Sequence, residues 1–164
     1  MITALMMLTA SPTAAAAQSQ AGQASCVLTT LVSNNDKDLK KAQSSCQQRF
    51  HWTDKQTELS TAIASSGSDM LLTRKQLSDA GVDVVALDLI LTVFTPEERK
   101  ILGSGASQTK QGRALLDRLA SYLASPKLGT QLGTLSGRYL LLKAHTDVLG
   151  EEFLAAGANS SSPK

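Results

Sequence analysis

A five-residue pattern that occurs three times constrains the fold of this chain more than any other feature. An apolar residue is followed by Thr, by two further residues and then by Gln or Glu at positions 52–56, 72–76 and 94–98. In a capping box, the Thr hydroxyl accepts a hydrogen bond from the third helical amide, and the side chain at that third position accepts one from the Thr amide. Pro96 stands at the first helical position of the third copy, where its missing N–H is not needed. The pattern predicts helices that start near residues 54, 74 and 96.

Glycines are placed where these helices would end. Gly67, Gly81 and Gly103 each follow a run with helical spacing, and each suits the left-handed position just after a helix. Residues 82–94 are apolar at all but three positions, and no second strand-like run exists to pair with them. We therefore expect residues 82–94 to form a central buried helix, apolar over most of its circumference.

Other helical segments complete the prediction. Residues 34–36 can cap a helix that continues through Gln48, and apolar residues recur at helical spacing over residues 115–123. Ser125 and Pro126 can then start another helix. The fold class expected is all-α: a single compact bundle of about five to seven short helices with one disulfide.

The N-terminal segment is typical of a secretory signal peptide. A short apolar run over residues 2–10 is followed by Ala15, Ala16 and Ala17, which match the A-x-A cleavage pattern. We expect a signal peptide over residues 1–17, with cleavage as late as residue 24 as the alternative, then one helical domain over 18–156 and a disordered tail over 157–164. No Lys or Arg precedes Asp36, so the start lies upstream or the segment is an Ala-rich tail of a cytosolic protein. Export, to the periplasm or out of the cell, is the interpretation favoured.

Cys26 and Cys46 are the two cysteines of the chain. In an exported protein, an even pair most simply forms one disulfide. The alternatives are two buried free thiols or one reactive thiol in a cytosolic protein. There is no C-x-x-C motif, so the sequence does not favour a zinc site or a redox centre.

Charge and composition exclude several classes of partner. The formal net charge is +2, from 16 basic and 14 acidic residues, and the basic cluster at residues 37–41 is interrupted by Asp38. A nucleic-acid interface would need basic residues gathered on one face. Base stacking would need more aromatic residues than the one Trp, two Tyr and three Phe of this chain. The apolar run at residues 2–10 is too short to cross a bilayer. We expect no nucleic-acid partner and no membrane span.

Three glycines, Gly129, Gly133 and Gly137, recur every fourth residue. On a helix they would share one face, although each costs about 1 kcal/mol relative to Ala. Three interpretations remain open: a helix packed closely against another backbone in the core, a segment broken into loops, or a homo-oligomer contact. Gln131, Ser136 and Arg138 make a membrane helix of the GxxxG type implausible.

Candidate catalytic residues are few. His51 lies beside Trp52, and His145 is the second histidine of the chain. Two histidines without supporting carboxylates do not make a metal site. We therefore predict no catalytic residue, no metal and no cofactor, and we name His51, Trp52 and the three glycines as candidate partner-binding residues.

The segment Leu72-Thr73-Arg74-Lys75-Gln76 resembles the LTxxQ signature of the periplasmic Spy/CpxP-type stress chaperones. Residues 52–56 and 94–98 are similar to it with substitutions. The resemblance implies a periplasmic helical binding protein. Members of that family generally lack a disulfide and a glycine row, so the chain departs from the family pattern, and no functional residue is transferred.

These observations favour a small exported helical protein that binds another protein, such as an immunity protein, a secretion-system accessory or a chaperone-like factor. The alternatives are a small exported hydrolase whose site is not recognisable in one sequence, and a cytosolic helical adaptor. An enzyme is the less favoured class, because no constellation of residues in the sequence implies chemistry.

Overall fold

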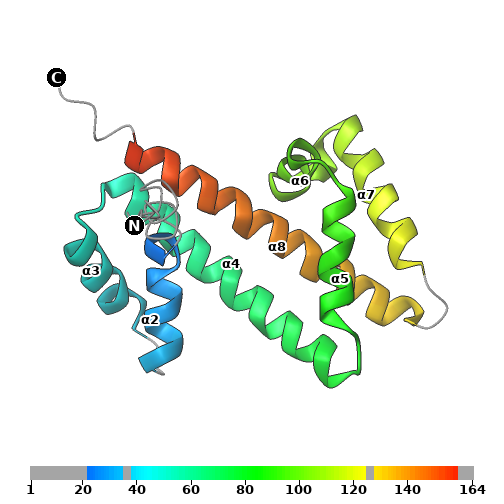
Figure 1. The fold of residues 1–164 in the computed structure, drawn as a ribbon, viewed down its shortest axis with the longest axis horizontal. Coiled ribbons are helices and arrows are strands. Elements are labelled where there is room, and N and C mark those ends of the chain that lie inside the picture. Colours follow the sequence, from blue (N-terminus) through cyan, green and yellow to red (C-terminus); the bar gives the residue numbers. More distant parts are fainter. Residues whose placement is uncertain (1–21, 35–37, 125–127, 159–164) are drawn as a thin grey trace, which may run out of the picture.

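Two long antiparallel helices form the centre of the molecule (Figure 1). The computed structural model describes residues 22–34, 38–124 and 128–158. Helix α4 (Asp54–Asp79) has 26 residues and helix α8 (Gly129–Ala158) has 30. Ser66 and Thr146 share a hydrogen bond of 2.9 Å between the two helices, and Gly157, near the end of α8, faces Gln56 in the first turn of α4. Helix α8 is apolar on much of its circumference, as expected of a helix covered on several sides.

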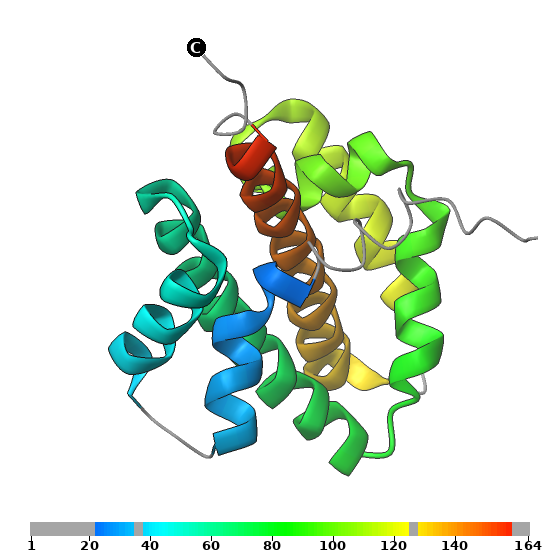
Figure 2. The ribbon, with the colours of Figure 1, turned by 60° about the vertical axis from the view of Figure 1, so that its left-hand side comes forward.

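Shorter helices cover two sides of this central pair. Figure 2 shows α8 running between two groups of helices, one on each side. The first group is α2 (Cys26–Asn34) and α3 (Leu39–Phe50), which pack on α4. The second group is α5 (Val84–Ile90), the 3₁₀ turn η1 (Leu91–Val93), α6 (Pro96–Gly103), the 3₁₀ turn η2 (Ala106–Gln108) and α7 (Lys110–Leu123).

The apolar core divides into two clusters that α8 connects. One cluster lies among α4, α5, α6, α7 and the first half of α8, where Leu77 and Leu140 are fully buried. The other lies among α2, α3, the first half of α4 and the end of α8, where Val27 and Phe153 are buried. The all-α fold is confirmed for the described residues, which contain no strand. None of the described helices combines the length and the apolarity that crossing a bilayer would require.

The predicted disulfide is confirmed. Cys26 and Cys46 are bonded, with their Cα atoms 6.1 Å apart, and the bond joins α2 to α3. Cys46 is 1% exposed and belongs to the second core cluster. The hydroxyl of Thr30 lies 3.7 Å from its sulfur. No described cysteine is free.

Two of the three capping boxes are confirmed. Thr53 caps α4 and Thr95 caps α6, and in each case both hydrogen bonds of the box are present. The predicted cap at residues 34–36 is wrong in its position, because α3 begins at Leu39 and the side chain of Asp38 accepts from the amide of Lys41 at 3.1 Å. Local hydrogen bonding therefore sets three of the helix starts, as capping residues do in general.

The third capping box does not form. Thr73 lies inside α4, is 3% exposed, and donates its hydroxyl to the carbonyl of Asp69 at 2.8 Å. Gly67, predicted to end a helix, is also inside α4 and faces the side chain of Leu28 on α2. Burial against the neighbouring helices keeps α4 continuous through both positions, so the predicted helix start near residue 74 is wrong.

The apolar segment 82–94 is helical, but it is not a central buried helix. Val85, Leu89 and Val93 are 66%, 61% and 51% exposed and lie four residues apart, so one face of α5 and η1 is open to solvent. The opposite face packs into the first cluster. Asp88 accepts a hydrogen bond of 2.8 Å from the hydroxyl of Tyr139 on α8. Burial and this hydrogen bond to Asp88 raise the pKa of Tyr139 to about 12.

The remaining boundary predictions have mixed outcomes. Gly81 has the predicted left-handed backbone, with a φ of 78°, just after α4. Gly103 is instead the last residue of α6, and Gly105 takes the positive φ of 95°. Helix α7 covers the predicted 115–123 segment, and α8 extends to Ala158. The predicted signal peptide, the predicted start at residues 125 and 126, and residues 159–164 of the predicted tail lie outside the described residues.

Candidate functional site

An apolar groove of about 1000 Å³ lies between α7 and α8, with α6 at one end. Helix α7 contributes Leu116, Leu119, Ala120, Leu123 and Ala124 at its end, and α6 contributes Leu102 and Gly103. Helix α8 contributes Gly129, Thr130, Gly133, Thr134, Gly137, Arg138, Leu141, Leu142 and His145. The volume is at the upper end of the range of ligand pockets in proteins.

The α6 end of the groove depends on a close contact between two backbones. A methyl group added at Gly103 would lie 2.7 Å from the carbonyl carbon of Ala144 on α8, and closer still to its oxygen. The neighbouring His145 directs its Nδ1 to the carbonyl oxygen of Gly103 at 2.7 Å. Because a carbonyl only accepts, Nδ1 carries the proton in this contact. Glycine at position 103 thus lets α6 approach α8 closely enough for His145 to close this end.

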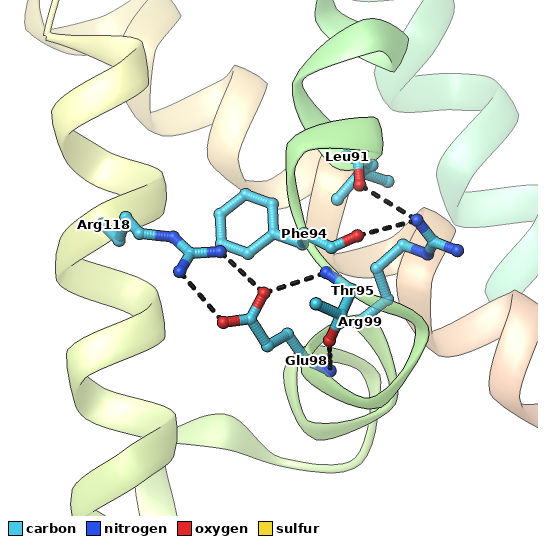
Figure 3. A network of polar contacts seen from close by, with 6 residues as sticks. All are labelled: Leu91, Phe94, Thr95, Glu98, Arg99 and Arg118. Atoms are coloured by element: carbon cyan, nitrogen blue, oxygen red, sulfur yellow. Dashed lines mark hydrogen bonds and ion pairs between the residues drawn. The ribbon is translucent and has the colours of Figure 1, made fainter.

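A charged contact fixes α7 relative to α6 (Figure 3). Arg118 on α7 donates to both carboxylate oxygens of Glu98 on α6, at 2.9 and 2.8 Å, and its guanidinium lies 4.2 Å from the ring centroid of Phe94. The same carboxylate accepts from the amide of Thr95 at 2.9 Å, so the capping box and the ion pair share one side chain. Paired, planar hydrogen bonds of this kind hold a fixed geometry. Arg118 precedes Leu119, so the contact also sets the α7 wall of the groove.

The ion pair is expected to make the protein sensitive to acid. The hydrogen bonds from Arg118 and from the Thr95 amide lower the pKa of Glu98 below its usual value. A lowered pKa in the folded state stabilises the fold fully above the pKa of the unfolded chain, and this contribution is lost as the pH falls through the folded-state pKa.

Glu98→Gln tests this contribution, because Gln keeps the capping box and removes the charge. We expect the urea midpoint of the wild-type protein to fall more than that of the variant when the pH is lowered from about 7 to about 3, across the range where carboxylates titrate. An equal fall in the two proteins would mean that the Glu98 ion pair does not contribute to stability.

The glycine row faces the groove and does not pack closely against another backbone. Helix α8 is continuous through the row, so the interpretation as a broken segment is wrong. A methyl group at Gly133 would lie 3.7 Å from the carbonyl oxygen of Leu123, and one at Gly137 would lie 3.5 Å from its Cδ1. Both are ordinary van der Waals distances. Gly129 has a φ of 63°, and nothing lies within 4 Å of an added methyl. Glycine is therefore explained at this position by the left-handed backbone conformation at the start of α8.

His51 and Trp52 are not among the residues that line the groove. His51 is exposed and takes a left-handed conformation, with a φ of 53°, in the turn between α3 and α4. Trp52 is 6% exposed and packs against Phe50 and Phe153 in the second core cluster. Phe153 is eight residues beyond His145, the last residue of α8 in the groove, and twenty beyond Gly133, or about 12 and about 30 Å along the helix axis. The structure therefore brings together the three glycines and not the five candidate residues.

The groove offers few groups for chemistry. Its ionisable lining residues are Arg138 and His145, and no acidic residue is among the lining residues that the structure describes. Across the described ranges, no three His, Cys, Asp or Glu residues are grouped so as to hold a metal ion. The lining is otherwise aliphatic, glycine and threonine, which suits the binding of an apolar surface.

Sequence reasoning missed the α7 wall of the groove. The helical spacing of Leu115, Leu119 and Leu123 predicts an amphipathic helix, but it does not reveal that Leu116 and Leu119 border a groove. The glycine row was the sequence signal for the groove, because glycine destabilises a helix interior and three of them on one face need a structural explanation. No family model matches the chain, and neither a curated protein nor a solved structure shows significant similarity to it.

Proposed function

We propose that this protein is an exported binding protein that holds an amphipathic α-helix of a partner protein in the groove between α7 and α8. The observation that carries the proposal is the pair of glycines, Gly133 and Gly137, on the wall of an open apolar groove. Export is supported by the disulfide, because such bonds persist in oxidising compartments.

The glycines need an explanation beyond the fold of the chain itself. In a helix interior each costs about 1 kcal/mol relative to Ala. At Gly133 and Gly137 a methyl group would meet only ordinary contacts, so α7 does not require glycine there. What glycine provides at these positions is depth in the groove. A partner that packs against α8 benefits from that depth, as helices with small residues at their interfaces do.

The dimensions of the groove favour a helix over a small molecule. The lining of α8 runs from Gly129 to His145, which is about 24 Å at 1.5 Å per residue. Several lining residues remain exposed along the edges, among them Thr130, Thr134 and Ala120. Small-molecule sites bury most of the ligand surface, whereas helix-binding grooves are open along their length.

The same lining supports binding over hydrolysis. The Nδ1 of His145 contacts the backbone carbonyl of Gly103 and no carboxylate orients the ring among the described residues. A general base in a hydrolase usually has such an orienting group beside a nucleophile. The groove residues therefore favour a protein-binding role, and the hydrolase alternative has no residue pair to support it.

A designed peptide and two matched variants test the proposal. The peptide is an amphipathic helix of about 16 residues, the length of the lined part of α8, with one leucine-rich face. Gly133→Leu fills the groove, and Gly150→Leu makes the same change on the same helix outside it, where nothing lies within 4 Å of an added methyl.

We expect the peptide to bind the wild-type protein and Gly150→Leu equally, and to bind Gly133→Leu at least about tenfold more weakly, about 1.4 kcal/mol. Calorimetry gives the affinity, and amide chemical shifts of residues 116–123 and 129–145 locate the site. Equal binding to all three proteins, or shifts outside these residues, would contradict the proposal. Thermal unfolding of the two variants checks that both are folded.

A further inference from the structure

We infer that the helix bound in this groove carries an acidic residue near the middle of its length, at the edge of its apolar face, where it pairs with Arg138. The inference rests on the proposed function and specifies the chemistry of the partner at the same site.

The first observation is the charge of the groove. Arg138 lines it near the middle of the stretch between Gly129 and His145. No Asp or Glu lines the groove among the residues that the structure describes. A segment with a basic residue at this position would therefore meet a like charge and no compensating carboxylate, whereas an acidic residue would meet its complement.

The second observation is that Arg138 is free to pair. No ion pair or hydrogen bond joins its side chain to another described residue. By contrast, Arg118 is held by Glu98, and Lys143 lies 3.6 Å from the carboxylate of Asp88. Arg118 and Lys143 thus each have a carboxylate partner on another helix, whereas the guanidinium in the groove has none.

The third step is the cost of covering the groove. A helix laid along α8 would bring its own side chains beside the exposed guanidinium of Arg138, and a like charge placed there would be disfavoured. A carboxylate on the occupant removes this cost, because Arg and a carboxylate form two parallel, charge-assisted hydrogen bonds. Arg138 therefore selects the charge of the occupant, while the leucines and glycines accept its apolar face.

Three peptides that differ at one position test the inference. Each is the amphipathic helix of about 16 residues used above, with Glu, Gln or Lys at the middle position on the edge of the leucine face. We expect the wild-type protein to bind the Glu peptide about tenfold more tightly than the Lys peptide, with the Gln peptide between them. In Arg138→Glu the order is expected to reverse, and in Arg138→Gln the preference is expected to disappear. Higher salt should narrow the preference, because it screens exposed charges.

The outcomes separate this inference from the proposed function. If all three peptides bind the wild-type protein equally and Gly133→Leu still weakens them, the groove binds helices without charge selection and the inference is overturned alone. If none of them binds, the proposed function falls and the inference with it. Binding of palmitate that Gly133→Leu abolishes, with no binding of any peptide, would identify a lipid as the occupant and overturn both. Arg138 is exposed, so its variants are expected to fold, and circular dichroism checks this.

Discussion

Replacement of Cys26 by Ser together with Cys46 by Ala is expected to lower the free energy of unfolding by about 3 kcal/mol. The bond spans a sequence separation of 20 residues, and its stabilising effect comes mainly from restricting the unfolded chain. Ala is chosen at position 46 because this residue is 1% exposed in an apolar cluster, where a Ser hydroxyl would need a partner.

Urea unfolding of the oxidised wild-type protein and of the double variant measures this difference. Hydrogen exchange should also show where the loss is concentrated, with the amides of α2 protected less in the variant and those of α8 changed least. The reason is that the disulfide cross-links α2 to α3, whereas α8 is held by contacts with α4, α6 and α7. Coincident unfolding curves for the two proteins would show that α2 is held by its apolar contacts alone.

Gly103→Ala is expected to destabilise the fold by about 1–3 kcal/mol, the usual cost of overpacking. The added methyl would lie 2.7 Å from the carbonyl carbon of Ala144 and 2.9 Å from Cγ2 of Val148. The first of these neighbours is backbone in the middle of α8, so relief requires a shift of α6 away from α8. The same shift would disturb the contact between His145 and the Gly103 carbonyl at the end of the groove.

Two glycines of α8 provide matched controls for this prediction. Gly150 has nothing within 4 Å of an added methyl, and the nearest atom at Gly133 is 3.7 Å away. Gly150→Ala and Gly133→Ala are therefore expected to stabilise the protein by about 0.4–1 kcal/mol, through helix propensity and a more restricted unfolded chain. Thermal melts of the three variants and the wild-type protein give the order of their stabilities directly. A neutral Gly103→Ala, or a destabilised Gly133→Ala, would contradict the packing described here.

The glycine row shows which part of the packing the sequence could not predict. Spacing four residues apart correctly placed Gly133 and Gly137 on one side of a helix. Close backbone approach within the core is one of the interpretations of this spacing, but the close approach occurs at Gly103 against Ala144 and at Gly112 against Ala106. These two glycines belong to no periodic pattern. A tight contact depends on which residues from distant parts of the chain meet, and spacing within one helix carries no information about that.

The features that the sequence alone determined are those set by short-range physics. The starts of α4 and α6 follow from hydrogen bonds within four residues, at Thr53 and Thr95, and an even pair of cysteines favours the disulfide that the structure contains. The helical class follows from apolar spacing without any strand-like partner segment. Each of these depends on groups close together in the chain or on a covalent bond.

The tertiary structure decided the rest, because burial competes with local preference. Thr73 has the same capping pattern as Thr53, yet contacts with other helices keep α4 continuous there. Val85 and Leu89 lie in a strongly apolar segment and remain exposed, because none of the helices that the structure describes covers that side of α5. The groove arises in the same way, from the contacts at Gly103 and Glu98 that set α6 and α7 against α8. Those contacts join residues far apart in the sequence, so the groove becomes visible only when the helices are placed in space.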